Sequence, residues 1–200
     1  MLLAVDTSGL PSVAVVEADG STLAEASGDD PRGHAEAIGP LLEQVLAGVD
    51  RGAIDAVAYG VGPGPYTGLR VGMAAARTAA FALGAAELPV LSHDALALGA
   101  LEEGAAPGFV VVADAKRRER FWTVYRELDG AGVPRAAGEP AVGPDEDVPD
   151  LPRVEGAVRA ALIGRVAALR RAAGLPPEPP EARYLRSPDV TLSVPKRVSA

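Results

Sequence analysis

The stretch LLAVDTSGLPSVAVVEADGSTLAEAS, residues 2–27, decides the fold class of this chain. It holds three short apolar runs, at 2–6, 12–17 and 22–27, and each run predicts a β-strand. Asp19-Gly20, between the second and third runs, is a pair typical of a hairpin turn. Because strands joined by tight turns pair antiparallel, the sequence predicts a sheet that opens with three antiparallel strands.

Helices and strands alternate after this stretch, which favours an α/β fold with a mixed sheet flanked by helices. Pro40 lies inside the first helical pattern, and since proline breaks helical hydrogen bonding, we expect the regular helix to start near Gly39. The expected order is a helix at 35–46, a strand at 54–59, a Gly/Pro loop at 60–67, a helix at 69–83, a short strand at 90–91 and a short helix at 94–101.

The run Ala105-Ala106-Pro107-Gly108 predicts a boundary between an N-terminal domain, residues 1–105, and a smaller C-terminal domain, residues 106–200. The second domain should hold strands at 109–113 and 120–128, an irregular stretch at 129–152 and a helix at 154–173 that Gly174 caps. The proline-rich tail, residues 175–200, is expected to lie extended over the surface.

The composition is that of a folded protein with few aromatic residues. Of 200 residues, 48% are hydrophobic and only 4% aromatic, so Ala, Val and Leu must build the core. The net charge of −8 disfavours strong direct binding of RNA by this chain alone. The absence of cysteine excludes disulfides and thiolate metal sites. No targeting or membrane-spanning segment is evident, so we expect a cytoplasmic protein.

The first candidate site is the turn after the first strand. Asp6, Thr7 and Ser8, followed by Gly9, offer a carboxylate and two hydroxyls that can face a nucleotide phosphate or a hydrated metal ion. The same residue types also suit an ordinary polar β-turn. This turn alone therefore leaves both interpretations open.

The second candidate is the loop GVGPGPYTGLR, residues 60–70, between a strand and a helix. Gly62, Gly64 and Gly68 permit close backbone approach, and Thr67 can cap the helix, whose free amides can hold an anion. The loop lacks the Gly-Lys-Ser/Thr ending of a Walker loop. It equally suits a rigid connection from strand to helix.

The third candidate is the basic segment DAKRRERFW, residues 114–122. Its four cations could meet RNA phosphates or a carboxylate on a partner, and they also suit a solvated hairpin tip, which the acidic net charge favours. His34 and His93 form no metal-ligand pair, and no Gly-x-Ser-x-Gly elbow is present. The sequence therefore predicts no metal site and no catalytic residue.

The chain resembles the TsaB family of bacterial tRNA-modification proteins over most of residues 1–127. The matching segments are Leu3–Ser8, the helix opening at His34, Gly62–Gly72, Ser92–Leu96, Asp114–Arg117 with Phe121-Trp122, and the tail Tyr184–Asp189, which is similar to that of actinobacterial members. Pro65-Tyr66 departs from the family, which typically has Ser-Phe there.

The resemblance implies an actin, hexokinase and Hsp70-like (ASKHA) fold with a reduced second domain. It also implies a non-catalytic subunit of the complex that transfers threonylcarbamoyl to the anticodon-adjacent adenosine of tRNA. The implied partners are TsaD, in a heterodimer, and the ATPase TsaE, with tRNA reached only through the complex and a homodimer formed in isolation. No membrane partner is expected.

The resemblance also assigns roles to residues. A degenerate nucleotide site would comprise Asp6, Thr7, Ser8, Gly62, Gly64, Thr67 and Gly68. It would hold no cofactor of its own, any ATP or ADP being bound by the assembled complex. The partner interface would lie on two helices, at Ile38, Leu42, Val45, Leu69, Met73, Ala76 and Ala80. The alternatives are an autonomous ATPase or kinase using Asp6 and the Gly62–Gly68 loop, a peptidase acting on the partner, and an interaction module unconnected with tRNA.

Overall fold

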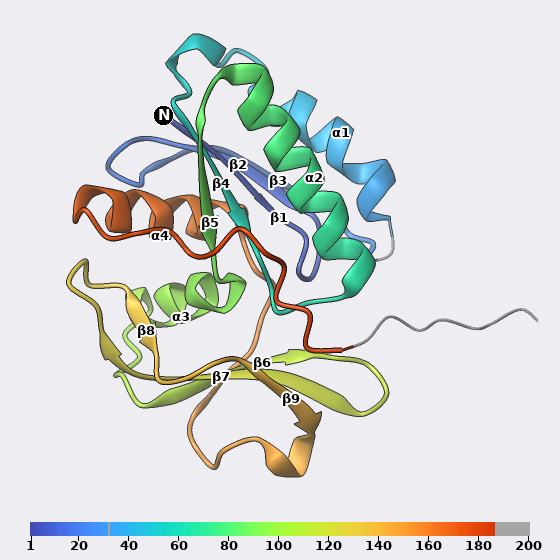
Figure 1. Ribbon diagram of the computed structural model, residues 1–200, viewed down its shortest axis with the longest axis vertical. Helices are drawn as coiled ribbons and strands as arrows, with labels where there is room; N and C mark the ends of the chain where they lie inside the picture. The colour runs from blue at the N-terminus through green and yellow to red at the C-terminus, as the bar shows by residue number, and fades with distance from the viewer. Residues whose placement is uncertain (32, 187–200) are drawn as a thin grey trace, which may run out of the picture.

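The computed structural model describes residues 1–31 and 33–186, which form two β-sheets with helices between and beside them (Figure 1). The first sheet has the order β3-β2-β1-β4-β5, in which β1 to β3 are antiparallel while β4 and β5 run parallel to β1. Its strands are β1 (Leu2–Asp6), β2 (Ser12–Val16), β3 (Thr22–Ser27), β4 (Ala56–Gly60) and β5 (Ala86–Val90). The predicted antiparallel opening and the mixed sheet are confirmed.

Both faces of the first sheet are covered. Leu3 and Val5 of β1 belong to a core shared with α1 (His34–Leu46) and α2 (Tyr66–Leu83), whereas Leu2 and Ala4 belong to a core shared with α3 (Ser92–Glu102) and α4 (Ala160–Ala172). Every residue of β1 is buried. Strands buried on both faces read as continuous apolar runs, which is the pattern of this strand in the sequence.

The second sheet has the order β10-β6-β7-β8, and β9 also pairs with β7. Its strands are β6 (Phe109–Asp114), β7 (Glu119–Leu128), β8 (Pro134–Ala136), β9 (Ala141–Pro144) and β10 (Arg153–Val154). Helices α3 and α4 lie between the two sheets (Figure 1). The other face of the second sheet is covered by an irregular segment that contributes Val148 and Leu151, together with the short 3₁₀ helix Asp145–Asp147.

Four expectations about secondary structure are wrong. Helix α1 is regular from His34 and passes through Pro40, because burial of its inner face outweighs one missing hydrogen bond on the exposed side. The stretch 129–152 contains β8 and β9. The helix expected from residue 154 begins at Ala160, since Val154 pairs with β6. Finally, β5 begins at Ala86, and its Pro89 is tolerated because β5 is an edge strand.

Helix α4 comes from the second half of the sequence but packs on the first sheet. Gly164 lies so close to β1 and β2 that an added Cβ would stand 2.7 Å from Val16 Cγ2. Gly174 follows the helix with φ +68°, the left-handed conformation typical after a helix end. The proposed division at residue 105 stays a prediction. The tail expected beyond residue 186 lies outside the described residues.

Helices of the described part of the chain are all too short or too polar to cross a membrane.

Candidate functional site

The carboxylate of Asp6 lies buried at the carboxyl end of β1, with 1% of its surface exposed. Asp6 Oδ1 accepts hydrogen bonds from the Ser8 backbone N–H at 2.8 Å and from Ser8 Oγ at 2.7 Å. Asp6 Oδ2 accepts one from Ser92 Oγ at 2.7 Å, and Ser92 Oγ in turn accepts one from the Gly62 N–H at 3.1 Å. One carboxylate thus joins β1, the glycine loop and the start of α3.

Burial raises the pKa of Asp6, and the hydrogen bonds from Ser8 and Ser92 act in the opposite direction. Both carboxylate oxygens already accept hydrogen bonds from the chain's own hydroxyl groups. None of these hydrogen-bond donors carries a positive charge, so none offsets the cost of burying the Asp6 carboxylate in its charged form. The arrangement therefore resembles a structural network more than an open ligand site.

Glycines let two turns pack against each other at this point. A Cβ at Gly60 would lie 1.8 Å from Asp6 Oδ2, and one at Gly72 would lie 2.0 Å from Thr7 Oγ1. Thr7 Oγ1 donates a hydrogen bond to the Gly68 carbonyl at 2.8 Å. A Cβ at Gly64 would lie 2.8 Å from the Ser8 Cα. Glycine is required at these positions because side-chain or backbone atoms of the first turn occupy the space that a Cβ atom would need.

The structure brings together six of the seven predicted nucleotide-site residues, namely Asp6, Thr7, Ser8, Gly62, Gly64 and Gly68. Thr67, the second residue of α2, is exposed to solvent. The expected capping role of Thr67 is wrong: Pro65 occupies the N-cap position, and no side chain caps the helix. Gly60 and Ser92, which lie against Asp6, and Gly72, which lies against Thr7, were missed as site residues, since only the fold brings them to this turn.

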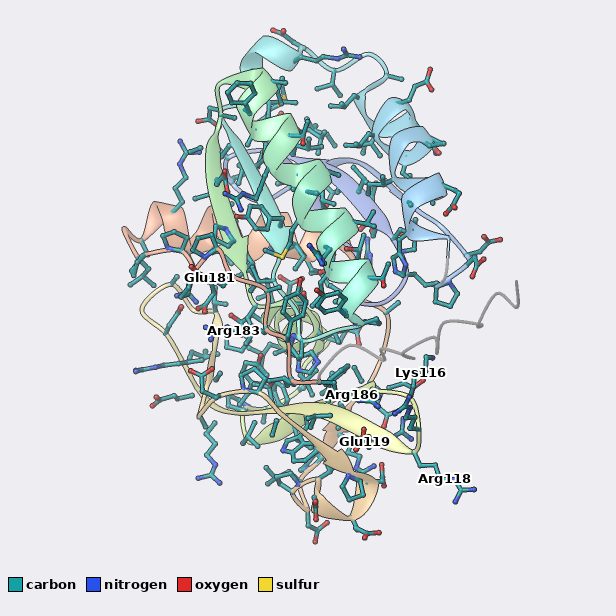
Figure 2. All side chains as sticks on the ribbon, turned by 45° about the vertical axis from the view of Figure 1, so that its right-hand side comes forward. Lys116, Arg118, Glu119, Glu181, Arg183 and Arg186 are labelled. Atoms are coloured by element: carbon teal, nitrogen blue, oxygen red, sulfur yellow. The ribbon has the colours of Figure 1, made fainter. Side chains whose placement is uncertain are left out.

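The segment 177–186, which we call the C-terminal strap, crosses this region (Figure 2). The Glu178 N–H donates to the Pro89 carbonyl at 3.1 Å, and the Arg183 N–H donates to the Val61 carbonyl at 2.8 Å. The Tyr184 ring lies 4.6 Å from the Tyr66 ring. Pro89 is in β5 and Val61 follows β4, so the strap lies across the carboxyl ends of two parallel strands. Ligands of open α/β sheets bind at such ends.

A second buried carboxyl group, that of Asp94, connects helices α3 and α4 to the second sheet. Asp94 Oδ1 accepts a hydrogen bond from Tyr125 Oη at 2.8 Å, and Arg170 Nη1 lies 3.8 Å from Asp94 Oδ2. Burial raises the pKa of Asp94 to about 7, although Tyr125 and Arg170 act to lower it. Asp94 and Arg170 line a cavity of about 450 Å³ that the strap borders with Glu178 and Arg183. No sequence pattern pointed to this cluster.

The histidine beside it is also buried. His93 Nδ1 lies 2.7 Å from Thr123 Oγ1, and burial lowers the pKa of His93 to about 3, so the ring is neutral at physiological pH. His34 Nε2 donates to the Gly9 carbonyl at 2.8 Å. Within residues 1–31 and 33–186, no group of three or more His, Asp or Glu side chains is placed to hold a metal ion.

The predicted interface residues face inward. Ile38, Val45, Leu69, Met73, Ala76 and Ala80 are each at most 9% exposed, and Leu42 is partly buried against the same core. Most of them hold α1 and α2 against the core, and of the seven only Leu42 is partly exposed. Whether these helices meet a partner stays a prediction, and the side chains available for such a contact are the exposed ones, among them Arg70, Ala74, Arg77, Thr78 and Phe81.

Comparisons with known proteins lead to proteins of tRNA threonylcarbamoyladenosine synthesis. The family model described as "TsaD: tRNA N6-adenosine threonylcarbamoyltransferase" matches residues 27–173. An uncharacterised protein of Mycobacterium leprae is 41% identical over 154 residues, which are 74% of this chain and 40% of that protein. The tRNA threonylcarbamoyladenosine biosynthesis protein TsaB of Escherichia coli is 37% identical over 101 residues, which are 48% of this chain and 42% of that protein.

The solved structure of YeaZ from Pseudomonas aeruginosa matches with a TM-score of 0.76 at 29% identity, covering 92% of this chain and 99% of that chain. The chain thus spans less than half the length of the two curated relatives but nearly all of a solved one. The predicted α/β fold, with a mixed sheet flanked by helices, and the expected actinobacterial kinship are confirmed. The chain belongs to the TsaB (YeaZ) family, whose members serve the synthesis of threonylcarbamoyladenosine in tRNA.

Proposed function

We propose that this chain is a non-catalytic subunit of the complex that transfers threonylcarbamoyl to tRNA, with a TsaD-type transferase as its partner. The observation that carries the proposal is the state of Asp6. Its two carboxylate oxygens accept hydrogen bonds from Ser8 and Ser92, so no oxygen is left without a protein donor. A catalytic carboxylate needs contact with a metal ion, a phosphate or a nucleophile.

The C-terminal strap supports the same conclusion. It lies across the carboxyl ends of β4 and β5, held by backbone hydrogen bonds to Val61 and Pro89 and by the contact of Tyr184 with Tyr66. A nucleotide approaching the glycine loop from that side would have to displace the strap. The chain therefore has no cofactor of its own in this proposal, and ATP or ADP would be bound by other subunits of the assembly.

The partner surface proposed here is the outer face of α2. Phe81 is 91% exposed, and Thr78 and Ala74 lie one and two turns before it on the same side. Small residues beside an exposed aromatic ring allow a second helix to approach closely and bury that ring. The occupant would be a helix of the TsaD-type partner. Without it, the same face would pair with a second copy in a homodimer.

The remaining parts of the proposal follow from the family. TsaE would join the assembled pair, tRNA would be reached through the complex, and the complex would work in the cytoplasm. Subunit function is consistent with the net charge of −8, which opposes strong binding of RNA by the whole surface of this chain.

The test is assembly. The purified chain is mixed with the TsaD homologue of the same organism, and the mass is measured by light scattering after size exclusion. The double variant Ala74→Glu with Phe81→Ser should abolish the heterodimer, because it adds a charge to the proposed contact surface and removes its aromatic ring. Both side chains are exposed and neither supports the core, so the fold should be preserved. Leu128→Ser, which removes an exposed apolar side chain from the second sheet, is the matched control and should leave assembly intact. A charged substitution at Ala76, one of the predicted interface residues, cannot serve as this test, since Ala76 is fully buried and the substitution would disturb the core.

A heterodimer that survives the double variant would move the interface away from α2. The absence of any complex, with or without nucleotide and TsaE, would favour the autonomous nucleotide-binding enzyme, which the buried carboxylate at the end of β1 keeps as the second candidate. Calorimetric titration of the isolated chain with ATP distinguishes the two. Tight binding that Asp6→Ala removes would support the enzyme.

A further inference from the structure

The hairpin between β6 and β7 has an unusual turn at its tip. Lys116, Arg117 and Arg118 all have positive φ angles, of 63°, 54° and 66°. The Glu119 N–H donates to the Lys116 carbonyl at 2.9 Å, which closes a tight turn with Arg117 and Arg118 at its centre. Turns with positive φ at both central residues strongly favour Asn-Gly. This chain has two arginines there instead.

Left-handed backbone is unfavourable for residues that carry a Cβ atom, and three consecutive residues hold it here. Asp114 stabilises the turn: its Oδ1 accepts a hydrogen bond from the Lys116 N–H at 2.9 Å, and its Oδ2 accepts one from Lys116 Nζ at 2.7 Å. Backbone strain of this kind concentrates at functional sites. The strain therefore indicates that these particular side chains have a use beyond closing the turn.

The three cations at the tip are exposed. Arg118 extends away from the body of the molecule (Figure 2), and within residues 1–31 and 33–186 it has no ion pair of its own. The strap adds a fourth cation beside the tip, since Arg186 donates to the Ala115 carbonyl and lies 3.3 Å from a Glu119 carboxylate oxygen. An acidic chain thus gathers positive charge on one projecting turn.

We propose that this arginine hairpin, residues 116–118, contacts the phosphate backbone of RNA. Guanidinium groups donate two parallel hydrogen bonds to phosphate and remain charged at all physiological pH values. Contacts to phosphate position a protein on nucleic acid without reading its sequence. The proposal rests on the proposed function, which makes tRNA the RNA in question.

An acidic protein surface is the other class of partner that cations could meet. Interfaces between proteins have an apolar centre within a polar rim. The tip offers no such centre, because Ala115 is buried and the residues that follow it are Lys, Arg, Arg and Glu. A narrow charged turn without exposed apolar surface fits a phosphate backbone better.

The decisive variant is Arg117→Asn with Arg118→Gly. It removes both guanidinium groups and installs the residues that the turn itself favours, so it should preserve the hairpin. Arg117→Lys with Arg118→Lys keeps the charge but removes the planar guanidinium groups that can donate two parallel hydrogen bonds. Arg51→Asn with Arg126→Asn changes the net charge equally at exposed positions elsewhere and is the matched control.

The complex of this chain with its TsaD homologue is titrated into a labelled, unmodified tRNA transcript at several KCl concentrations, and binding is followed by anisotropy. The Asn-Gly variant should bind roughly tenfold more weakly, and its slope of log K against log salt should be smaller by about 0.7–0.9 for each phosphate that is no longer neutralised. The lysine variant should keep most of the slope, and the matched control should bind like the parent.

Unchanged affinity and slope in the Asn-Gly variant would overturn the proposal. So would loss of the heterodimer with affinity for tRNA preserved, because the hairpin would then bind protein. If the parent chain does not assemble with the TsaD homologue, the proposed function fails separately, and the isolated chain is titrated with the same transcript at low salt. Binding that the Asn-Gly variant loses would then support the hairpin, and no binding by the parent would overturn it.

Discussion

The glycine loop at residues 60–68 and the arginine hairpin at residues 116–118 solve similar backbone problems with opposite residue types. In the loop, glycine stands where another part of the chain approaches closely, as at Gly60 against the Asp6 carboxylate and at Gly64 against the Ser8 backbone. In the hairpin, arginine stands where the φ angles favour glycine or asparagine. The loop is explained by packing alone, whereas the hairpin is not. The difference separates residues retained for the fold from residues that need another reason.

The largest expected effect is in the loop. Gly60→Ala should lower the free energy of unfolding by about 3 kcal/mol, because the new Cβ would lie 1.8 Å from Asp6 Oδ2 and the strand cannot shift freely. Urea denaturation measures this change. Gly39→Ala in α1 is the control, since no distant part of the chain lies within 4 Å of its Cβ position; because Gly39 precedes Pro40, we expect the free energy of unfolding to change by less than about 1 kcal/mol. Equal effects of the two substitutions would contradict the packing account.

The second prediction concerns Asp94, which lies between the loop and the hairpin and joins α3 to β7 through its hydrogen bond with Tyr125. Its pKa is about 7 in the folded chain and near its ordinary value of 3.8 when unfolded. The folded state therefore binds more protons between these values, and stability from this group is lost as pH rises toward and through 7. We expect the free energy of unfolding to fall by about 2–3 kcal/mol from pH 5 to pH 8.

The matched variant for this prediction is Asp94→Asn, which cannot ionise but can still accept a hydrogen bond from Tyr125. Urea midpoints at pH 5, 6, 7 and 8 should change less in the variant than in the parent chain. Parallel pH profiles for the two proteins would show that Asp94 does not titrate in this range.

Introducing glycine into the hairpin should raise the free energy of unfolding, whereas removing glycine from the loop should lower it. Arg117→Asn with Arg118→Gly should raise the free energy of unfolding by about 1–2 kcal/mol, because left-handed backbone is no longer imposed on arginine. Thermal melting measures the shift. Arg117→Lys with Arg118→Lys keeps the Cβ atoms and should melt with the parent. A lower melting temperature for the Asn-Gly variant would mean that the arginines stabilise the turn.

The smallest expected effect is at the strap. Tyr184→Ala removes the ring contact with Tyr66 and should destabilise the chain by about 1 kcal/mol, since the Tyr184 side chain is 43% exposed. Tyr184→Phe retains the ring and serves as the control in the same urea titration. A loss of several kcal/mol would mean that the strap is an integral part of the core.

Much of the first sheet could be predicted from local patterns. The runs at residues 2–6, 12–17 and 22–27 have the composition of buried strands, and Asp19-Gly20 joins two of them, so the antiparallel order needed no distant contact. The errors occurred where tertiary contacts override local preference. Pro40 is held in a helix by burial of its neighbours, and Val154 is a strand residue because β6 offers it a partner.

The candidate site divides in the same way. The sequence by itself determined the α/β class, the family and the two turns at Asp6 and Gly62, because these depend on residue types at short spacing. Only the tertiary structure decided that Ser92, 86 positions from Asp6, takes one oxygen of its carboxylate. It also decided that the predicted interface residues Leu69, Met73 and Ala76 are buried in the core, and that the strap crosses the ends of β4 and β5. The physical reason is that hydrogen-bond pairing between distant residues is a property of the packed chain, and an apolar stripe on a helix shows which face is buried without showing what covers it.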